Sequence, residues 1–303
     1  MSVTLRVGYF TPSVLLHLAR EWGVLADAGL VVVDTPVASS PAQFRSLRDG
    51  EFDLVLTSPD NVLAYRFVLD NPLGENLPVE ILGAVDRGLG LSLWTGPGVS
   101  SLSAVREGGL GVDVAQSGFA FVAYALLERR GLLPDDYETV ALGSTPRRVD
   151  ALVEGTCAAT ILNAGNELVA ATRGCTRVAN VDELGPYLGT VIAALADGDA
   201  ARRGAAQRFA SALRETARRV LSGAFESEVR EAARTVLHLD DDLARDHYAC
   251  VMDPVTGYIA DGTVARDAMA TLIDLRRRFR PAPELDLVMG QLDDVIVATA
   301  RPD

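Results

Sequence analysis

The stretch Thr4-Leu5-Arg6-Val7-Gly8-Tyr9-Phe10-Thr11-Pro12-Ser13 combines the two signals that decide the fold class. Residues 4–9 are typical of a β-strand, and Thr11-Pro12 then places a hydroxyl residue and a proline where a helix is expected to begin. The same order recurs at Ser40-Pro41, Ser58-Pro59 and Thr145-Pro146. Strands that run repeatedly into helix starts predict an α/β protein with mainly parallel sheets flanked by helices.

The rest of the chain extends this alternation in two series. The first is expected to hold strands at 4–9, 30–33, 52–56 and 79–94, and helices at 13–28, 41–48 and 61–69. After the turn-rich segment 95–101, the second is expected to hold strands at 110–112, 139–142, 158–162 and 189–194, and helices at 119–130 and 146–154. Beyond residue 197 the apolar spacing predicts a helical segment, with helices at 203–222, 227–237, 241–250 and 263–277.

Small polar residues gather at the predicted strand ends. Besides the hydroxyl–proline pairs, Gln116-Ser117-Gly118 and Asn163-Ala164-Gly165-Asn166 follow strands of the second series. In an open α/β sheet such ends lie along one edge, where ligands bind, and helix N-termini there attract anions or electron-rich groups. We therefore expect a ligand-binding site formed by Tyr9, Thr11, Ser39, Ser40, Ser58, Asp60, Asn61, Asp86, Gln116, Ser117, Phe119, Ser144 and Asn163.

Purely structural roles for these residues stay open at this point. A single hydroxyl–proline cap more often stabilises a helix than binds a ligand, and Ser40 with Gln43 also matches a capping box. Asp60 would favour the dipole of its helix with or without a ligand, and Asp86 beside Arg87 could be an ion pair at a hinge. Tyr9 and Phe119 could stack on a flat ligand.

The composition excludes several classes of partner and chemistry. The chain has 303 residues and a formal charge of -13, so we expect neither nucleic acid nor an anionic membrane surface as a partner. All 28 basic residues are arginines, which excludes a lysine Schiff base and a P-loop lysine. The three cysteines, Cys157, Cys175 and Cys250, lack the spacing of a zinc site or a disulfide framework. We expect no metal and no cofactor.

Enzyme motifs give little support for catalysis. The sequence has no GxSxG, GxGxxG or HExxH motif, and His17, His238 and His247 lie outside the strand-end loops. Catalytic residues therefore stay unknown. If the chain is an enzyme, a lyase, decarboxylase or hydrolase acting on a small aromatic or heterocyclic acid, its candidates are Asp60, Asp86 and Tyr9. A sensor or partner-binding protein is a third hypothesis.

Six segments together resemble one protein class, the substrate-binding proteins of ABC transporters for nitrate, sulfonates, taurine and thiamine-pyrimidine precursors, which includes SsuA-like and NMT1/THI5-like proteins. The segments are Arg6-Val7-Gly8-Tyr9, Gly23-Val24-Leu25-Ala26-Asp27-Ala28-Gly29-Leu30, Gly50-Glu51-Phe52-Asp53-Leu54-Val55, Leu102-Ser103-Ala104-Val105-Arg106, Gly111-Val112-Asp113 with Ser117-Gly118, and Arg148 to Ala159.

This resemblance implies a type II periplasmic-binding-protein fold. The first lobe would comprise residues 1–92 and 196–303, the second residues 93–195, and two crossover strands would form a hinge that closes the lobes on a small polar or heterocyclic molecule. An ABC-transporter permease is the expected partner of an exported form. Because no signal peptide precedes the first strand, we expect a cytoplasmic location for the sequence as given, and a periplasmic or extracellular one if a leader was removed.

Overall fold

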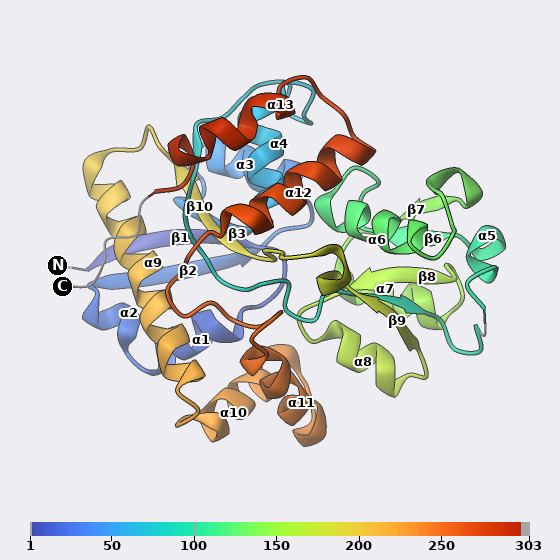
Figure 1. Ribbon diagram of the computed structural model, residues 1–303. Helices are drawn as coiled ribbons and strands as arrows, with labels where there is room; N and C mark the ends of the chain where they lie inside the picture. Colours follow the sequence, from blue (N-terminus) through green and yellow to red (C-terminus); the bar gives the residue numbers. More distant parts are fainter. Residues whose placement is uncertain (1, 100, 298–303) are drawn as a thin grey trace.

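The computed structural model describes residues 2–99 and 101–297 and arranges them as two lobes with a five-stranded sheet in each (Figure 1). The first sheet has the strand order β2-β1-β3-β10-β4 and consists of β1 (Val3–Tyr9), β2 (Leu30–Pro36), β3 (Leu54–Thr57), β4 (Val79–Ala84) and β10 (Val191–Leu195). The second has the order β7-β6-β8-β5-β9 and consists of β5 (Ser92–Thr95), β6 (Leu110–Val112), β7 (Thr139–Ala141), β8 (Ala159–Leu162) and β9 (Thr176–Asn180).

In each sheet one strand runs against its neighbours. β10 pairs antiparallel with β3 and β4, and β5 pairs antiparallel with β8 and β9, while β1–β3 and β6–β8 are parallel pairs. These two strands are the ones that enter a lobe after the chain has crossed from the other. Val191 lies opposite Thr57 at the end of β3, and Ser92 lies opposite Leu162 at the end of β8. Both crossings therefore lie at the edge where the parallel strands end.

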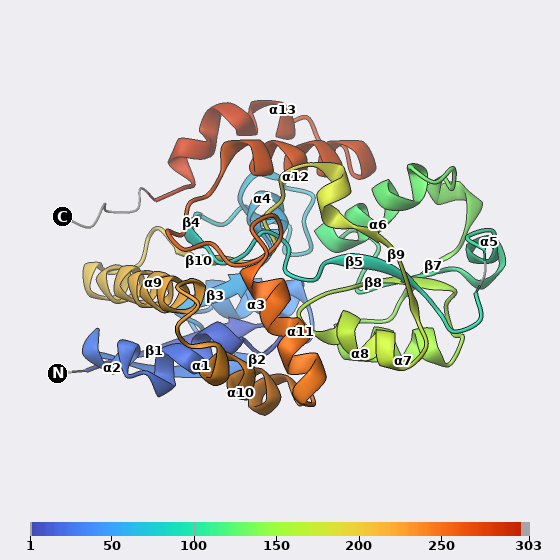
Figure 2. The ribbon, with the colours of Figure 1, turned by 60° about the horizontal axis from the view of Figure 1, so that its bottom comes forward.

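Helices cover both faces of each sheet, as Figure 2 shows. On one face of the first sheet lie α1 (Val14–Glu21), α2 (Val24–Asp27), α9 (Ala200–Leu221), α10 (Glu226–Leu237) and α11 (Asp241–Met252). On its other face lie α3 (Ser40–Arg48), α4 (Pro59–Phe67), α12 (Arg266–Phe279) and α13 (Leu285–Val288). In the second lobe, α6 (Gly118–Glu128) covers one face, and α7 (Thr145–Val153) and α8 (Asn166–Thr172) cover the other, with the short α5 (Ala104–Gly108) near the sheet edge.

The apolar pattern of the strands explains this layering. Along β3, Leu54 and Leu56 pack into the cluster around α1 and α9, whereas Val55 packs into the cluster around α4 and α12. Successive side chains of a strand point to opposite faces, so a continuous apolar strand needs cover on both sides. Short 3₁₀ turns at 134–136, 181–184 and 289–294 complete the secondary structure of the described residues.

Several local predictions differ from the structure, and the short helices α5, α8 and α13 were not predicted. The predicted helix 13–28 is two helices, because Gly23 adopts a left-handed backbone with a φ of 71°. The predicted strand 79–94 is two strands, separated by the crossing segment 85–91. β10 belongs to the first sheet, so the second crossing lies before residue 191 and not at the predicted boundary of 195/196. β9 was not predicted, because its sequence Thr-Arg-Val-Ala-Asn has little apolar character and its pairing with β5 defines it.

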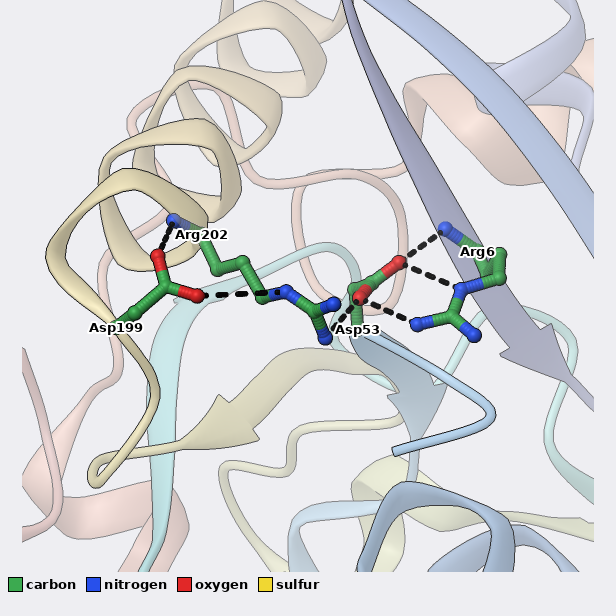
Figure 3. Close-up of polar contacts among 4 residues, drawn as sticks. All are labelled: Arg6, Asp53, Asp199 and Arg202. Carbon is green, nitrogen blue, oxygen red and sulfur yellow. Dashed lines mark hydrogen bonds and ion pairs between the residues drawn. The ribbon is translucent and has the colours of Figure 1, made fainter. Parts of the chain in front are cut away.

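An ion-pair cluster joins the two separate chain segments of the first lobe (Figure 3). The buried carboxylate of Asp53 accepts hydrogen bonds from the backbone N–H, Nε and Nη2 of Arg6 at 2.8, 3.1 and 2.9 Å. It also accepts one from Nη1 of Arg202 on α9 at 3.1 Å, and Asp199 caps that helix through the backbone N–H of Arg202. The C-terminal segment is thereby tied to the start of the N-terminal sheet.

Among the described residues, none of the helices combines the length and the apolar character needed to cross a membrane.

Candidate functional site

A cavity of about 270 Å³ lies between the two lobes, at the edge where the strands end. Most first-lobe positions of its wall lie at the ends of β1, β2, β3 and β4, with others in α9, α10 and α11, and the second-lobe positions follow β6, β7 and β8. The wall is formed by residues 9–14, 37–40, 56–58, 61, 85, 86, 89, 113, 114, 117–119, 143–145, 148, 163, 164, 189, 190, 213, 237, 247 and 258.

Five helices begin at this cavity with a serine at the N-cap. The caps are Ser13 of α1, Ser39 of α3, Ser58 of α4, Ser117 of α6 and Ser144 of α7, and all five line the cavity. Each helix start carries backbone N–H groups without an intrahelical acceptor and a partial positive charge. The cavity therefore presents several aligned donors to an anion or to an electron-rich group.

The structure brings most of the predicted site residues together. The cavity wall contains Tyr9, Thr11, Ser39, Ser40, Ser58, Asn61, Asp86, Ser117, Phe119, Ser144 and Asn163. Their gathering follows from the topology, because every one of them lies at or just after the end of a strand or in a crossing segment. Their contact with a ligand stays a prediction.

Asp60 does not belong to the wall. Its carboxylate accepts two hydrogen bonds of 2.7 Å from Nε and Nη2 of Arg276, and both side chains are buried. A carboxylate held in this way is not available to a ligand in the cavity. The predicted ligand contact and the alternative catalytic role of Asp60 are therefore corrected to a structural ion pair.

Gln116 is also outside the wall, since it is exposed in the turn before α6. The neighbouring residue, Ser117, lines the cavity instead. Its hydroxyl donates to Oδ1 of Asp113 at 2.5 Å and accepts from the backbone N–H of Ala120 at 3.0 Å. Asp113 lines the cavity too and was not predicted.

The predicted capping box at Ser40 is not formed. Ser39 is the N-cap and accepts from the backbone N–H of Ala42 at 3.4 Å. Gln43 does not reach back to the cap, because its buried amide donates to the carbonyls of Gly8 and Leu56 at 3.1 Å each. It thereby fastens α3 to β1 and β3, the strands that end at the cavity.

No protein-family model matches the chain, and no curated protein matches it in a sequence comparison. Solved structures do match it over nearly its whole length. The alkanesulfonate-binding protein SsuA from Xanthomonas axonopodis pv. citri, bound to MOPS, is 16% identical, with 94% of this chain and 96% of that chain covered and a TM-score of 0.74. The periplasmic nitrate-binding protein NrtA from Synechocystis is 14% identical, with coverage of 97% and 86% and a TM-score of 0.74.

A third match has its fold named directly. The CA3427 gene product of Candida albicans, described as having the generic periplasmic-binding-protein fold, is 16% identical, with 99% of this chain and 98% of that chain covered and a TM-score of 0.74. The chain has the type II periplasmic-binding-protein fold. The two crossings of this periplasmic-binding-protein fold lie side by side, because the backbone N–H of Val85 donates to the carbonyl of Thr190 at 2.8 Å.

Asp86 lies in the first crossing segment, and its hydrogen bonds connect the two crossings. Its Oδ1 accepts from the backbone N–H groups of Gly88 at 2.8 Å and Leu89 at 3.0 Å, and its carbonyl accepts from the N–H of Gly189 at 3.0 Å. Complete burial raises the pKa of Asp86 above its usual range, although these backbone donors oppose the shift. Arg87 donates to the carbonyl of Tyr258, so no ion pair between Asp86 and Arg87 is observed among the described residues.

Two basic residues line the cavity that the sequence analysis did not predict as site residues. Arg148 is 2% exposed, and its guanidinium donates to the carbonyls of Gly143 and Ile161 and to the hydroxyl of Thr145. These acceptors are all uncharged, and burial lowers the pKa of Arg148, although the nearby Asp113 opposes the shift. Its position one helical turn after Ser144, at a predicted helix start, could have indicated from the sequence that Arg148 lies near the site.

His247 is the second missed residue, and no sequence signal points to it. It lies within α11, far from any strand end, and α11 packs against α10 of its own lobe and α8 of the other lobe beside the cavity. The described residues contain no group of three or more His, Cys, Asp or Glu side chains placed to hold a metal ion.

Proposed function

We propose that the chain binds a small polar or heterocyclic molecule reversibly in the cleft between its lobes, and that the lobes close on the molecule by a hinge motion. The observation that carries this proposal is the convergence of five serine-capped helix N-termini, from both lobes, on one cavity. Enclosed pockets with a few convergent polar groups are the usual form of small-molecule sites.

The second-lobe wall supports an anionic or electron-rich group on the ligand. Arg148 supplies a buried cation with uncharged partners, and the free N-cap hydroxyl of Ser144 lies at the same helix start. Asp113 opposes this field, although its Oδ1 already accepts a hydrogen bond from the hydroxyl of Ser117. A ligand group with lone pairs, turned toward the starts of α6 and α7, would therefore be stabilised by fixed dipoles.

Tyr9 and Phe119 support a flat or apolar body on the same ligand. The two rings come from the end of β1 in one lobe and the start of α6 in the other, and both line the cavity while half-buried. Aromatic side chains at such positions contribute contact area with little loss of conformational freedom. Closure of the lobes would bring them onto the ligand.

The structural matches support binding without naming the ligand. One similar structure is an alkanesulfonate-binding protein with bound MOPS, and another is a nitrate-binding protein. Both names describe small polar ligands, which is the class proposed for this chain. The permease partner and the cellular location stay predictions.

The test is the release of a small molecule from the purified protein. Mass spectrometry after denaturation should find one molecule per chain in the wild type and much less in Ser117→Ala and Asn61→Ala. Asp199→Ala is the matched control, because it also removes an N-cap but lies at the start of α9, away from the cavity wall. Equal occupancy in all four proteins, or none in the wild type at saturating concentrations of a broad metabolite mixture, would contradict the proposal.

A further inference from the structure

His247 is a buried polar side chain on the cavity wall with nothing to bind. The residue is 1% exposed, and neither Nδ1 nor Nε2 has a hydrogen-bond partner among the described residues. Burial lowers the pKa of His247 to about 4, so the ring is neutral at pH 7 and carries one N–H donor and one acceptor nitrogen. Buried donors and acceptors are nearly always paired, so an unpaired imidazole at a cavity indicates a missing partner.

Much of the first-lobe wall of the cavity that contains His247 is apolar. Val14, Leu89, Leu213, Leu237 and Tyr258 line the same cavity, and all five belong to or pack against one apolar cluster around α1, α9, α10 and α11. This part of the wall is defined here as the apolar chamber. It lies on the α11 side of the cleft, where side chains of α9, α10 and α11 close the space.

The second lobe closes this chamber at one point. A Cβ atom at Gly165, between β8 and α8, would lie 3.1 Å from Cδ1 of Leu237 and 3.9 Å from Nδ1 of His247. The preceding residue, Ala164, lines the cavity and has a φ of 55°, a left-handed backbone that is strained for alanine. The two lobes therefore meet tightly next to His247, and a molecule that reaches it is enclosed by both.

The cavity thus has two chemically different ends. Helix N-termini, serine hydroxyls and Arg148 form the polar end, while the apolar chamber forms the other, where the imidazole of His247 has no hydrogen-bond partner among the described residues. A wholly polar ligand would leave the chamber unfilled, and a wholly apolar tail would leave the imidazole unpaired.

We propose that His247 selects an elongated ligand, whose anionic or polar head lies at the helix N-termini and whose apolar body crosses the chamber to an uncharged hydrogen-bonding group that pairs with the imidazole. The proposal rests on the function proposed above and specifies the class of molecule bound there. A hydroxyl, carbonyl or ring nitrogen has the required chemistry. An anionic tip is excluded, because the neutral imidazole and the nearby carboxyl of Asp86 offer it no opposite charge.

The test compares two matched pairs of probes by isothermal titration calorimetry. The pairs are 3-(4-hydroxyphenyl)propanoate with 3-phenylpropanoate, and 6-hydroxyhexanoate with hexanoate, so each pair differs only in the terminal hydroxyl. The wild type should bind the hydroxylated member of at least one pair about tenfold more tightly than its partner. His247→Phe should abolish that preference, and His247→Gln, which keeps a donor and an acceptor, should retain part of it.

Two controls separate this role from a structural one. His17→Phe alters a histidine of α1 that does not line the cavity, and it should leave the preference unchanged. The melting temperature of the ligand-free protein should be unchanged or higher in His247→Phe, since an unpaired buried imidazole is replaced by an apolar ring. A clear fall in the melting temperature would mean that His247 has a structural partner, and would overturn the proposal.

Absence of a preference in the wild type for either pair, including absence of binding, also overturns the proposal. That result leaves the proposed function intact if the purified wild type still releases a small molecule that Ser117→Ala does not hold. If nothing is released either, the proposed function itself has failed.

Discussion

Arg276 of the C-terminal helix α12 holds the carboxylate of Asp60 at the start of α4 through two hydrogen bonds of 2.7 Å. The guanidinium carbon also lies 5.2 Å from the ring centre of Phe121 on α6, and Gly118 of α6 packs against Asp60. This pair therefore connects both chain segments of the first lobe to the second lobe. The pair lies next to the N-cap of α4 but does not line the cavity. It therefore holds that part of the cavity wall in place from within the protein interior.

Breaking this pair should be costly. Asp60→Asn or Arg276→Met leaves the other charged group buried without its partner, and the free energy of unfolding should fall by about 3–5 kcal/mol. Urea denaturation measures the change. Arg277→Gln is the matched control, because Arg277 is the next residue of α12 and its pairing with Asp286 is exposed, so its loss should be below about 1 kcal/mol. A similar loss of unfolding free energy in the Arg276 and Arg277 variants would contradict this role of the Asp60–Arg276 pair.

A side chain at Gly189 should disturb the crossings. A Cβ atom there would overlap Oδ1 of Asp86 and would lie 2.8 Å from Cα of Gly88, so Gly189→Ala should reduce the free energy of unfolding by about 2 kcal/mol and weaken ligand binding. Gly204→Ala, within α9, has only Arg208 nearby at 3.7 Å and should raise stability by about 0.5–1 kcal/mol. Denaturation curves of both variants check the difference. A neutral Gly189→Ala would mean that the crossings have room to adjust.

Glu167 should make the protein less stable as the pH rises. The side chain is 4% exposed, and burial raises its pKa from 4.5 to about 8, although its Oε2 accepts from the N–H of Gly165. Between pH 4.5 and 8 the unfolded chain loses this proton while the folded chain keeps it, so stability falls by up to about 1.4 kcal/mol per pH unit. Below pH 4.5 both states hold the proton and the effect disappears.

The variant Glu167→Gln isolates this effect, because glutamine has nearly the same shape and does not titrate. Its stability relative to the wild type should be constant below pH 4.5 and should increase steadily from pH 4.5 to 8. Urea denaturation at a series of pH values gives the difference directly. A difference that stays constant across the whole range would show that Glu167 is ionised in the folded protein.

The fold and much of the site follow from local sequence signals. Apolar runs and helix-start chemistry are local, so the alternation of strands and helices was predictable, as were wall positions such as Ser58, Ser117 and Asn163. The exact N-cap positions were less predictable. Ser39 and Ser144 are the N-cap residues of α3 and α7 in place of Ser40 and Thr145, and only the hydroxyl of Ser39 accepts a hydrogen bond from its own helix.

What the sequence did not predict depends on contacts between distant segments. Asp60 was expected at the ligand because it begins a helix at a strand end, but Arg276, 216 residues later, takes its carboxylate. His247 lines the cavity because of where α11 packs against α10 and α8, which no periodicity within α11 encodes. The β9 strand likewise depends on its partner β5.

The most direct test is a crystal structure of the protein purified from cells without added ligand. We expect electron density for a small molecule enclosed between the lobes, in contact with the starts of α6 and α7 on one side and with Tyr9 on the other. A cleft that holds ordered water alone in both purified and metabolite-soaked crystals, or that is filled by the protein's own side chains, would contradict this expectation.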